Sequence, residues 1–211
     1  MNEEDYVKEL AKQADDTVDL LSSVRKSERE RMICAAFLRC LGVEFSPTEI
    51  ALPDSDPPDV VFRDGQFEIM IVLDEERKMH ADWRAEANKR HAAKGLDDLG
   101  EPYHSSSPMK SAEIVERLVS ELSKKATHYG PKTCSELDAL AYINLQGRHL
   151  YPISEIDVPE DFQSQGWRSV SFIFSPYSHV VFTTAKAPDF LCSHKGRTKQ
   201  ECKNPDEIFE L

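Results

Sequence analysis

The sequence predicts an α/β fold, in which a central mixed sheet of about five or six strands is flanked by helices. Apolar residues recur at helical spacing in two segments, residues 28–41 and 109–127. Short runs rich in β-branched and aromatic residues occupy 60–73, 138–145 and 169–184. This order of helix, strands, helix and further strands is typical of a sheet that carries helices on both faces.

Length and composition indicate a globular chain with one domain, residues 1–211. Of its 211 residues, 40% are hydrophobic and 30% are charged, which suits a single soluble domain. The longest apolar runs are far shorter than the ~20 residues that cross a bilayer. The acidic N-terminus lacks an apolar signal core, and the five cysteines are scattered. We therefore expect a cytoplasmic protein with no membrane segment.

The charge balance weighs against one class of function. The formal net charge is −12 at pH 7, whereas a broad nucleic-acid-binding surface needs lysine and arginine for its phosphate contacts. Charges can segregate on a surface, however, and a metal site is acidic by construction. Nucleic acid therefore stays a possible partner.

The segment 57–73 is the part around which the rest of the chain is organised. Two apolar runs flank Asp64-Gly65, a pair that predicts a two-residue hairpin turn because glycine accepts a positive φ. Counting outward from this turn, side-chain alternation puts Val60, Phe62, Phe67, Ile69 and Ile71 on a packing face, and Asp59, Val61, Glu68 and Met70 on the other. The carboxylates of Asp59 and Glu68 are then expected roughly 5–8 Å apart. At that spacing they can share a hard cation such as Mg²⁺ or Mn²⁺.

This pattern, Pro58-Asp59 followed by Glu68-x-Met70, resembles the PD-(D/E)XK signature of the restriction-endonuclease-like superfamily. The order of elements is similar over about residues 28–145, and the whole chain resembles a bacterial family of uncharacterised endonucleases. The resemblance implies a restriction-endonuclease-like core and Mg²⁺-dependent hydrolysis of phosphodiester bonds. It also implies that Asp59 and Glu68 hold the metal, with the backbone carbonyl of Ile69 as a further ligand.

One residue departs from the signature, because Met70 stands where the superfamily has a lysine that orients or deprotonates the attacking water. A lysine from a nearby element can replace it in such folds, and Lys78 and Lys110 are the candidates because each begins a helix next to the motif. The missing lysine and the acidic charge leave a second hypothesis open, a non-catalytic interaction module that retains the nuclease-like fold. A metal-dependent hydrolase of small phosphate esters is a third.

The first core helix carries another candidate ligand. Ser27 and Glu30 match a capping box at its start. Glu30 also lies near the inward edge of the apolar stripe that contains Ile33 and Phe37. In the resembled superfamily a glutamate on this helix often points at the metal. Both roles, helix cap and metal ligand, are therefore open for Glu30.

Several other segments carry weaker signals. We expect a helix over residues 3–24, a first strand from Val43 to Leu52, and a basic helix over 74–94 that is either solvated or in contact with phosphates. Ser107-Pro108 is typical of the start of the second core helix. Residues 149–166 have no regular pattern, and a C-terminal hairpin and tail fill 167–211, with a short helical turn at 206–209.

The C-terminal segment also contains soft metal ligands. Cys192, His194 and Cys202 offer three, whereas a structural zinc site normally has four in paired short spacings. Cys134 or His179 would have to complete the set. The sequence leaves open whether these residues bind metal.

Overall fold

The computed structural model describes residues 2–75, 77–100, 106–151 and 159–200, and the chain divides into two compact units. One unit comprises Met1–Arg29 and Leu73–Ser105, and the other comprises Glu30–Val72 and Ser106–Leu211. The nuclease-like core expected over residues 28–145 therefore includes parts of both units. The single-domain organisation stays a prediction.

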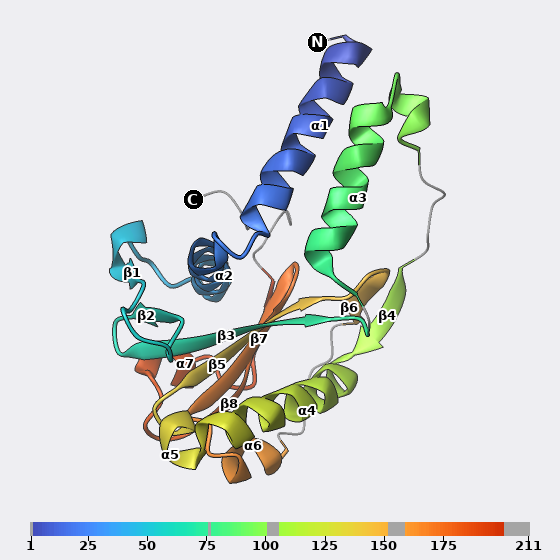
Figure 1. Cartoon of the computed structure of the whole chain (residues 1–211). Helices are drawn as coiled ribbons and strands as arrows, with labels where there is room; N and C mark the ends of the chain where they lie inside the picture. Colours follow the sequence, from blue (N-terminus) through green and yellow to red (C-terminus); the bar gives the residue numbers. More distant parts are fainter. Residues whose placement is uncertain (1, 76, 101–105, 152–158, 201–211) are drawn as a thin grey trace. The chain divides into compact units, whose positions relative to one another are not determined.

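The first unit is built from two long helices, α1 (Glu3–Leu20) and α3 (Met79–Ala92), followed by a short 3₁₀ turn, η2 (Leu96–Asp98). The helices lie side by side (Figure 1). Polar contacts join them: His91 Nε2 lies 2.8 Å from Asp15 Oδ2, and Arg90 Nη1 donates to the Leu10 carbonyl at 3.1 Å. Both helices are shorter than expected. Part of the basic face of α3 is used to pair with α1.

The second unit contains a seven-stranded mixed sheet, which confirms the predicted α/β class with one strand more than the upper expectation. Its order is β1 (Ile50–Ala51), β2 (Val60–Phe62), β3 (Gly65–Leu73), β5 (Asp138–Asn144), β7 (Ser169–Phe174), β8 (Tyr177–Thr183) and β9 (Thr198–Gln200). Strands β5 and β7 are parallel, while β1–β2, β2–β3, β7–β8 and β8–β9 are antiparallel. The first strand keeps only two of its expected residues because Pro47–Glu49 forms a 3₁₀ turn, η1.

Two long helices cover opposite faces of this sheet, as the sequence predicted (Figure 1). Helix α2 (Lys26–Leu41) packs Ile33 and Phe37 against Val60, Phe67 and Ile69 in one core cluster. Helix α4 (Ser111–Tyr129) contributes its inward residues to the other cluster, together with Met70 and Val72 of β3: Ile114, Val115, Leu118 and Leu122. Alternation along β3 therefore directs Glu68 toward α4.

The β2–β3 hairpin differs from its predicted register. Phe62 pairs with Gly65 and Val60 with Phe67, so the loop residues are Arg63 and Asp64, and Arg63 has the positive φ of 53°. The predicted Asp64-Gly65 turn is therefore wrong by one residue. Glycine is needed at 65 for a different reason: a Cβ there would lie 2.9 Å from the Phe67 ring and 3.0 Å from the Phe62 carbonyl oxygen.

The predicted faces survive this change of register. The pairing differs by two residues, an even number, so every side chain keeps the side of the sheet that alternation assigned to it. Phe67 lies opposite Val60, and its carbonyl oxygen accepts a hydrogen bond from Asp59 N at 3.0 Å, so the ladder shifts by one residue at Asp59.

A second, two-stranded parallel sheet was not predicted. It pairs β4 (Ser107–Lys110) with β6 (Arg148–Tyr151), where the sequence suggested a helix start and an irregular segment. Helix α4 consequently begins at Ser111, with Lys110 as its N-cap. Three short helices complete the described elements: α5 (Pro131–Cys134), α6 (Asp161–Ser164) and α7 (Asp189–Cys192). The helical turn expected at 206–209 lies outside the described residues.

A search of the described helices finds none with the length and apolar character that a membrane crossing requires.

Candidate metal centre

Three carboxylates from β3, the start of β2 and the loop before β2 converge. One oxygen each from Asp56, Asp59 and Glu68 lies within 4.8 Å of the others. Asp59 immediately precedes β2, Glu68 is on β3, and Asp56 comes from the proline-rich loop before them. The predicted convergence of Asp59 and Glu68 is thus observed, and the loop adds a third carboxylate, that of the exposed Asp56.

Glu68 is the buried member of this group, with 2% of its surface exposed. Its Oε1 accepts hydrogen bonds from Tyr129 Oη at 2.9 Å and from Lys125 Nζ. Its Oε2 is buried and accepts no hydrogen bond from the residues that the structure describes. Burial raises the pKa of the Glu68 carboxyl and Asp59 adds to the increase, while Lys125 and Tyr129 oppose it. One side of the carboxylate is therefore fully engaged and the other is open to a ligand.

Helix α4 delivers both donors. The apolar stripe through Leu118 and Leu122 continues at the same helical spacing to Lys125 and Tyr129, which are four residues apart and so lie on one side of the helix. Lys125 Nζ also lies 3.4 Å from the carbonyl oxygen of Ile69. Burial and the nearby Glu68 carboxylate raise the pKa of the Tyr129 phenol, which keeps it a hydrogen-bond donor.

The cation beside the motif is therefore Lys125, which the sequence analysis missed. Lys110 is the N-cap of the same helix and precedes Lys125 by fifteen positions, which amount to roughly 22 Å of helical rise. Lys78 is the N-cap of α3 in the other unit. One feature of the sequence could have identified Lys125: it is a lysine at an inward position of the amphipathic helix α4.

The neighbouring motif residues fix the geometry. Asp59 Oδ2 accepts a hydrogen bond from Ile69 N at 2.8 Å, which orients the Asp59 carboxylate toward β3. Met70 packs in the core cluster that includes α4 and is 9% exposed. Met70 is thus a packing residue between β3 and the helix that carries the lysine.

Glu30 is buried on α2, the helix that packs against the opposite face of β3. Within the described ranges, the converging acidic group consists of Asp56, Asp59 and Glu68 and leaves Glu30 outside it. The expected capping box does not form as predicted, because α2 begins at Lys26 and Ser27 is its second residue. A metal-binding role for Glu30 stays a prediction.

The soft ligands near the C-terminus are engaged in local contacts. His194 Nδ1 lies 2.7 Å from the Phe190 carbonyl oxygen, and Cys192 Sγ lies 3.5 Å from that of Ala187. Cys134 is buried in the α4-side core, and His179 Nδ1 lies 2.9 Å from Thr198 Oγ1. Cys202 lies outside the described residues, so zinc binding by this set is untested.

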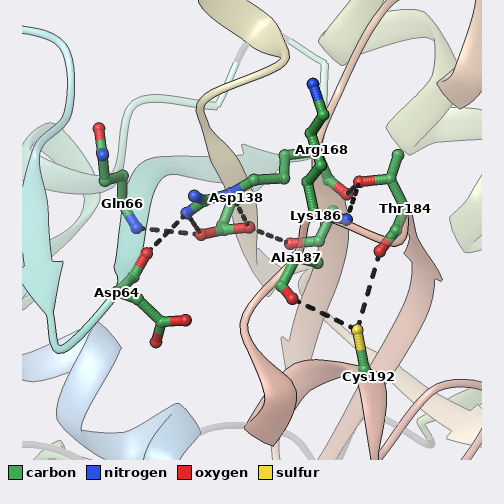
Figure 2. A network of polar contacts seen from close by, with 9 residues as sticks. Asp64, Gln66, Asp138, Arg168, Thr184, Lys186, Ala187 and Cys192 are labelled. Atoms are coloured by element: carbon green, nitrogen blue, oxygen red, sulfur yellow. Dashed lines mark hydrogen bonds and ion pairs between the residues drawn. The ribbon is translucent and has the colours of Figure 1, made fainter.

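A second buried carboxylate anchors the hairpin that carries the site (Figure 2). Asp138, at the start of β5, accepts from Arg168 Nε and Ser169 Oγ at its Oδ1, and from Gln66 N and Arg168 Nη2 at its Oδ2. Arg168 Nη2 also donates to the carbonyl oxygen of Asp64 in the β2–β3 loop at 3.1 Å. The start of β3 is therefore tied to the two central strands.

The fold and this site define a mixed α/β protein with a half-paired, buried carboxylate in an acidic cluster. Residues 2–203 match a protein family described as "Putative endonuclease, protein of unknown function (DUF1780)". The chain belongs to this family, which confirms the predicted membership in a family of uncharacterised endonucleases.

Other comparisons give less information about function. The chain is 32% identical to a protein of unknown function from Pseudomonas aeruginosa strain PAO1, whose solved structure is described as Monooxygenase Superfamily. The match covers 95% of this chain and 97% of that chain, with a TM-score of 0.67. No curated protein matches.

Proposed function

We propose that this protein is a Mg²⁺- or Mn²⁺-dependent nuclease that hydrolyses phosphodiester bonds. The observation that carries the proposal is the buried Glu68 carboxylate, which clusters with those of Asp56 and Asp59 and whose Oε2 has no hydrogen-bond partner among the described residues. A buried oxygen without a partner costs free energy that a ligand can recover. Three clustered carboxylate oxygens are the kind of donor set that hard divalent cations prefer. The residues present therefore fit such a cation.

Each residue has a distinct role in this proposal. Glu68, Asp59 and Asp56 would hold the cation, which when bound lowers the pKa of a coordinated water and neutralises charge on the scissile phosphate. The Ile69 backbone N–H orients Asp59. Tyr129 holds Glu68 through Oε1. Lys125 places an ammonium next to the site, where it can orient the attacking water as the lysine of the resembled signature does.

The surface charge near Lys125 favours nucleic acid as the substrate. The end of α4 that carries Lys125 also exposes Lys124, and α5 exposes Lys132. Cations beside an acidic centre provide the phosphate contacts that a nuclease needs, despite the net charge of −12. An interaction module would not require them. The description of the family as an endonuclease points the same way.

The monooxygenase description of the Pseudomonas aeruginosa relative suggests a different chemistry. Non-haem iron oxygenases typically bind their metal through two histidines and one carboxylate. The converging group found among the described residues consists of carboxylates alone. That donor set favours Mg²⁺ or Mn²⁺, so we retain hydrolysis as the function.

The test is cleavage of single- and double-stranded DNA and RNA in the presence of Mn²⁺ or Mg²⁺. Wild type should cleave at least one substrate, and Glu68→Gln, Asp59→Asn and Lys125→Met should each lose ~10²-fold or more in rate. Lys110→Ala and Lys78→Ala are matched lysine controls and should retain activity. Metal binding without cleavage of any nucleic acid would instead support the interaction module. Cleavage that survives Glu68→Gln would point to another site or a contaminant.

A further inference from the structure

We propose that the ammonium group of Lys125 permanently takes the place of a second metal ion, so that the site binds one divalent cation only. This inference rests on the proposed function, because it assumes that Asp56, Asp59 and Glu68 hold a cation. In this inference the two oxygens of the Glu68 carboxylate contact two different cations. Oε1 contacts the Lys125 ammonium, and Oε2 binds the metal ion.

The contacts of Lys125 are those of a metal-like cation. Its Nζ contacts Glu68 Oε1 and lies 3.4 Å from the carbonyl oxygen of Ile69. A carboxylate oxygen and a backbone carbonyl oxygen are also common ligands of hard divalent ions. In two-metal hydrolytic sites the ions lie ≈ 3.5–4 Å apart, a separation that a bridging carboxylate can span. Glu68 has the corresponding position here, with an ammonium on one side.

The remaining lone pairs limit where a metal can bind. Oε1 already accepts from Lys125 and from Tyr129, and each carboxylate oxygen offers about two acceptor positions. Oε2 accepts from no group among the described residues. A cation held together with Asp56 and Asp59 therefore uses Oε2, and Lys125 has no need to move.

The charges lead to the same stoichiometry. The three clustered carboxylates and the one ammonium leave two negative charges, which a single divalent cation balances. A second divalent ion would add an uncompensated double charge close to the first ion and to Lys125. At such short distances like charges repel strongly. Lys125 thus sets the metal content of the site as well as contributing a positive charge to it.

The test is the number of Mn²⁺ ions bound by the full chain, measured by calorimetry and by electron paramagnetic resonance. Wild type should bind one Mn²⁺ and give the spectrum of isolated ions. Lys125→Ala removes the ammonium and opens the space between Glu68 Oε1 and the Ile69 carbonyl. This variant should bind two ions, the second roughly tenfold or more weakly, and show a spin-coupled pair.

Two further variants keep the result interpretable. Lys124→Ala removes the neighbouring lysine, whose side chain is 68% exposed and pairs with Glu121, and should bind one ion. Tyr129→Phe frees a lone pair on Oε1 but leaves the ammonium in place, and should also bind one. Two ions in Tyr129→Phe would mean that any loosening of Oε1 admits a second metal, which contradicts the assignment to Lys125.

The outcomes separate this inference from the proposed function. Binding of one ion by both wild type and folded Lys125→Ala overturns the inference and leaves the metal site intact. A spin-coupled pair in wild type overturns it without any variant, so the inference can fail even if Lys125→Ala does not fold. Binding of no Mn²⁺ by wild type overturns the metal site and the inference together.

Discussion

The second unit contains two buried carboxylates that each contact a cation, and they differ in how completely they are paired. Asp138 is fully buried, and both of its oxygens accept two hydrogen bonds, from Arg168, Ser169 and Gln66 N. Glu68 is almost as buried, but its two donors share Oε1, and no group in the described part of the chain donates to Oε2.

The difference distinguishes a structural ion pair from a candidate binding site. A fully bonded buried pair has no capacity for a ligand, so its contribution is to fix the strands that it joins. A buried carboxylate with one unpaired oxygen costs free energy, and the rest of the fold has to offset that cost. The Glu68 carboxylate belongs to an acidic cluster, and a metal bound there would give that cost a functional explanation.

The largest expected effect is a difference between the Asp138–Arg168 pair and the Glu68–Lys125 pair in what each contributes to the free energy of unfolding. Arg168→Met should lower the free energy of unfolding by about 3–5 kcal/mol, because it leaves Asp138 buried without its charge partner. Lys125→Met should cost only about 1 kcal/mol, since the Lys125 side chain is 30% exposed and Tyr129 still donates to Glu68. Urea denaturation at neutral pH measures both. Equal losses would mean that the Glu68 pair is as structural as the Asp138 pair.

A third buried group, His179, is half-bonded like Glu68 and sharpens the comparison because it lies outside the acidic cluster. Its Nε2 has no hydrogen-bond partner within the described ranges, and burial lowers the pKa of His179 to about 4. Below its usual value of ~6.5 the unfolded chain binds a proton that the folded chain does not, so stability should fall between pH ~6.5 and ~4, by at most about 3 kcal/mol. Urea titrations of wild type and His179→Gln at the two pH values test this.

Metal binding at the Glu68 site should increase the stability of the folded protein. At a Mn²⁺ concentration 100 times Kd, wild type should gain about 2.7 kcal/mol of stability. Glu68→Gln and Asp59→Asn should lose most of this gain. Asp54→Asn, in the same loop as Asp56 but outside the cluster, should keep it. Thermal or urea unfolding with and without Mn²⁺ provides the measurement, and an equal gain in all four proteins would place the ion elsewhere.

The smallest expected effect concerns pH. Because the pKa of Glu68 is raised, the proton competes with the metal at a higher pH than at an ordinary glutamate. Mn²⁺ affinity should therefore fall as the pH drops through that raised pKa, by up to about tenfold per unit. Tyr129→Phe removes a hydrogen bond that lowers this pKa, so its affinity should begin to fall at a higher pH. Calorimetric titrations over a pH series decide this, and coincident profiles would show that Tyr129 does not act on Glu68.

The fold was predictable where the local pattern and the packing agree. Strands β5 and β7 and helix α4 follow from strong apolar periodicity, and the faces of the hairpin follow from alternation alone. The turn was not predictable in the same way. Gly65 is required by the nearby rings of Phe67 and Phe190, which is a tertiary effect that no turn propensity contains.

The site was predictable only in part, because its members come from distant segments. Asp59 and Glu68 are set by one hairpin, so counting along two strands places them together. Lys125 reaches Glu68 across 57 positions of sequence, and Arg168 reaches Asp138 across 30. Which residues become partners depends on how α4 and β7 pack. From the sequence alone, Lys125 and Arg168 can be recognised only as polar residues at inward positions.

The alternation of side chains along β3 limits which length changes the hairpin can tolerate. Removing or adding one residue between Gly65 and Glu68 would turn the Glu68 carboxylate toward the face that packs on α2, among Val60, Phe67 and Ile69. It would also move Glu68 away from Lys125 and Tyr129. A change of length in the loop before Asp59 would leave β3 in phase and alter only the approach of Asp56. Viable insertions and deletions are therefore expected in that loop and not at the start of β3.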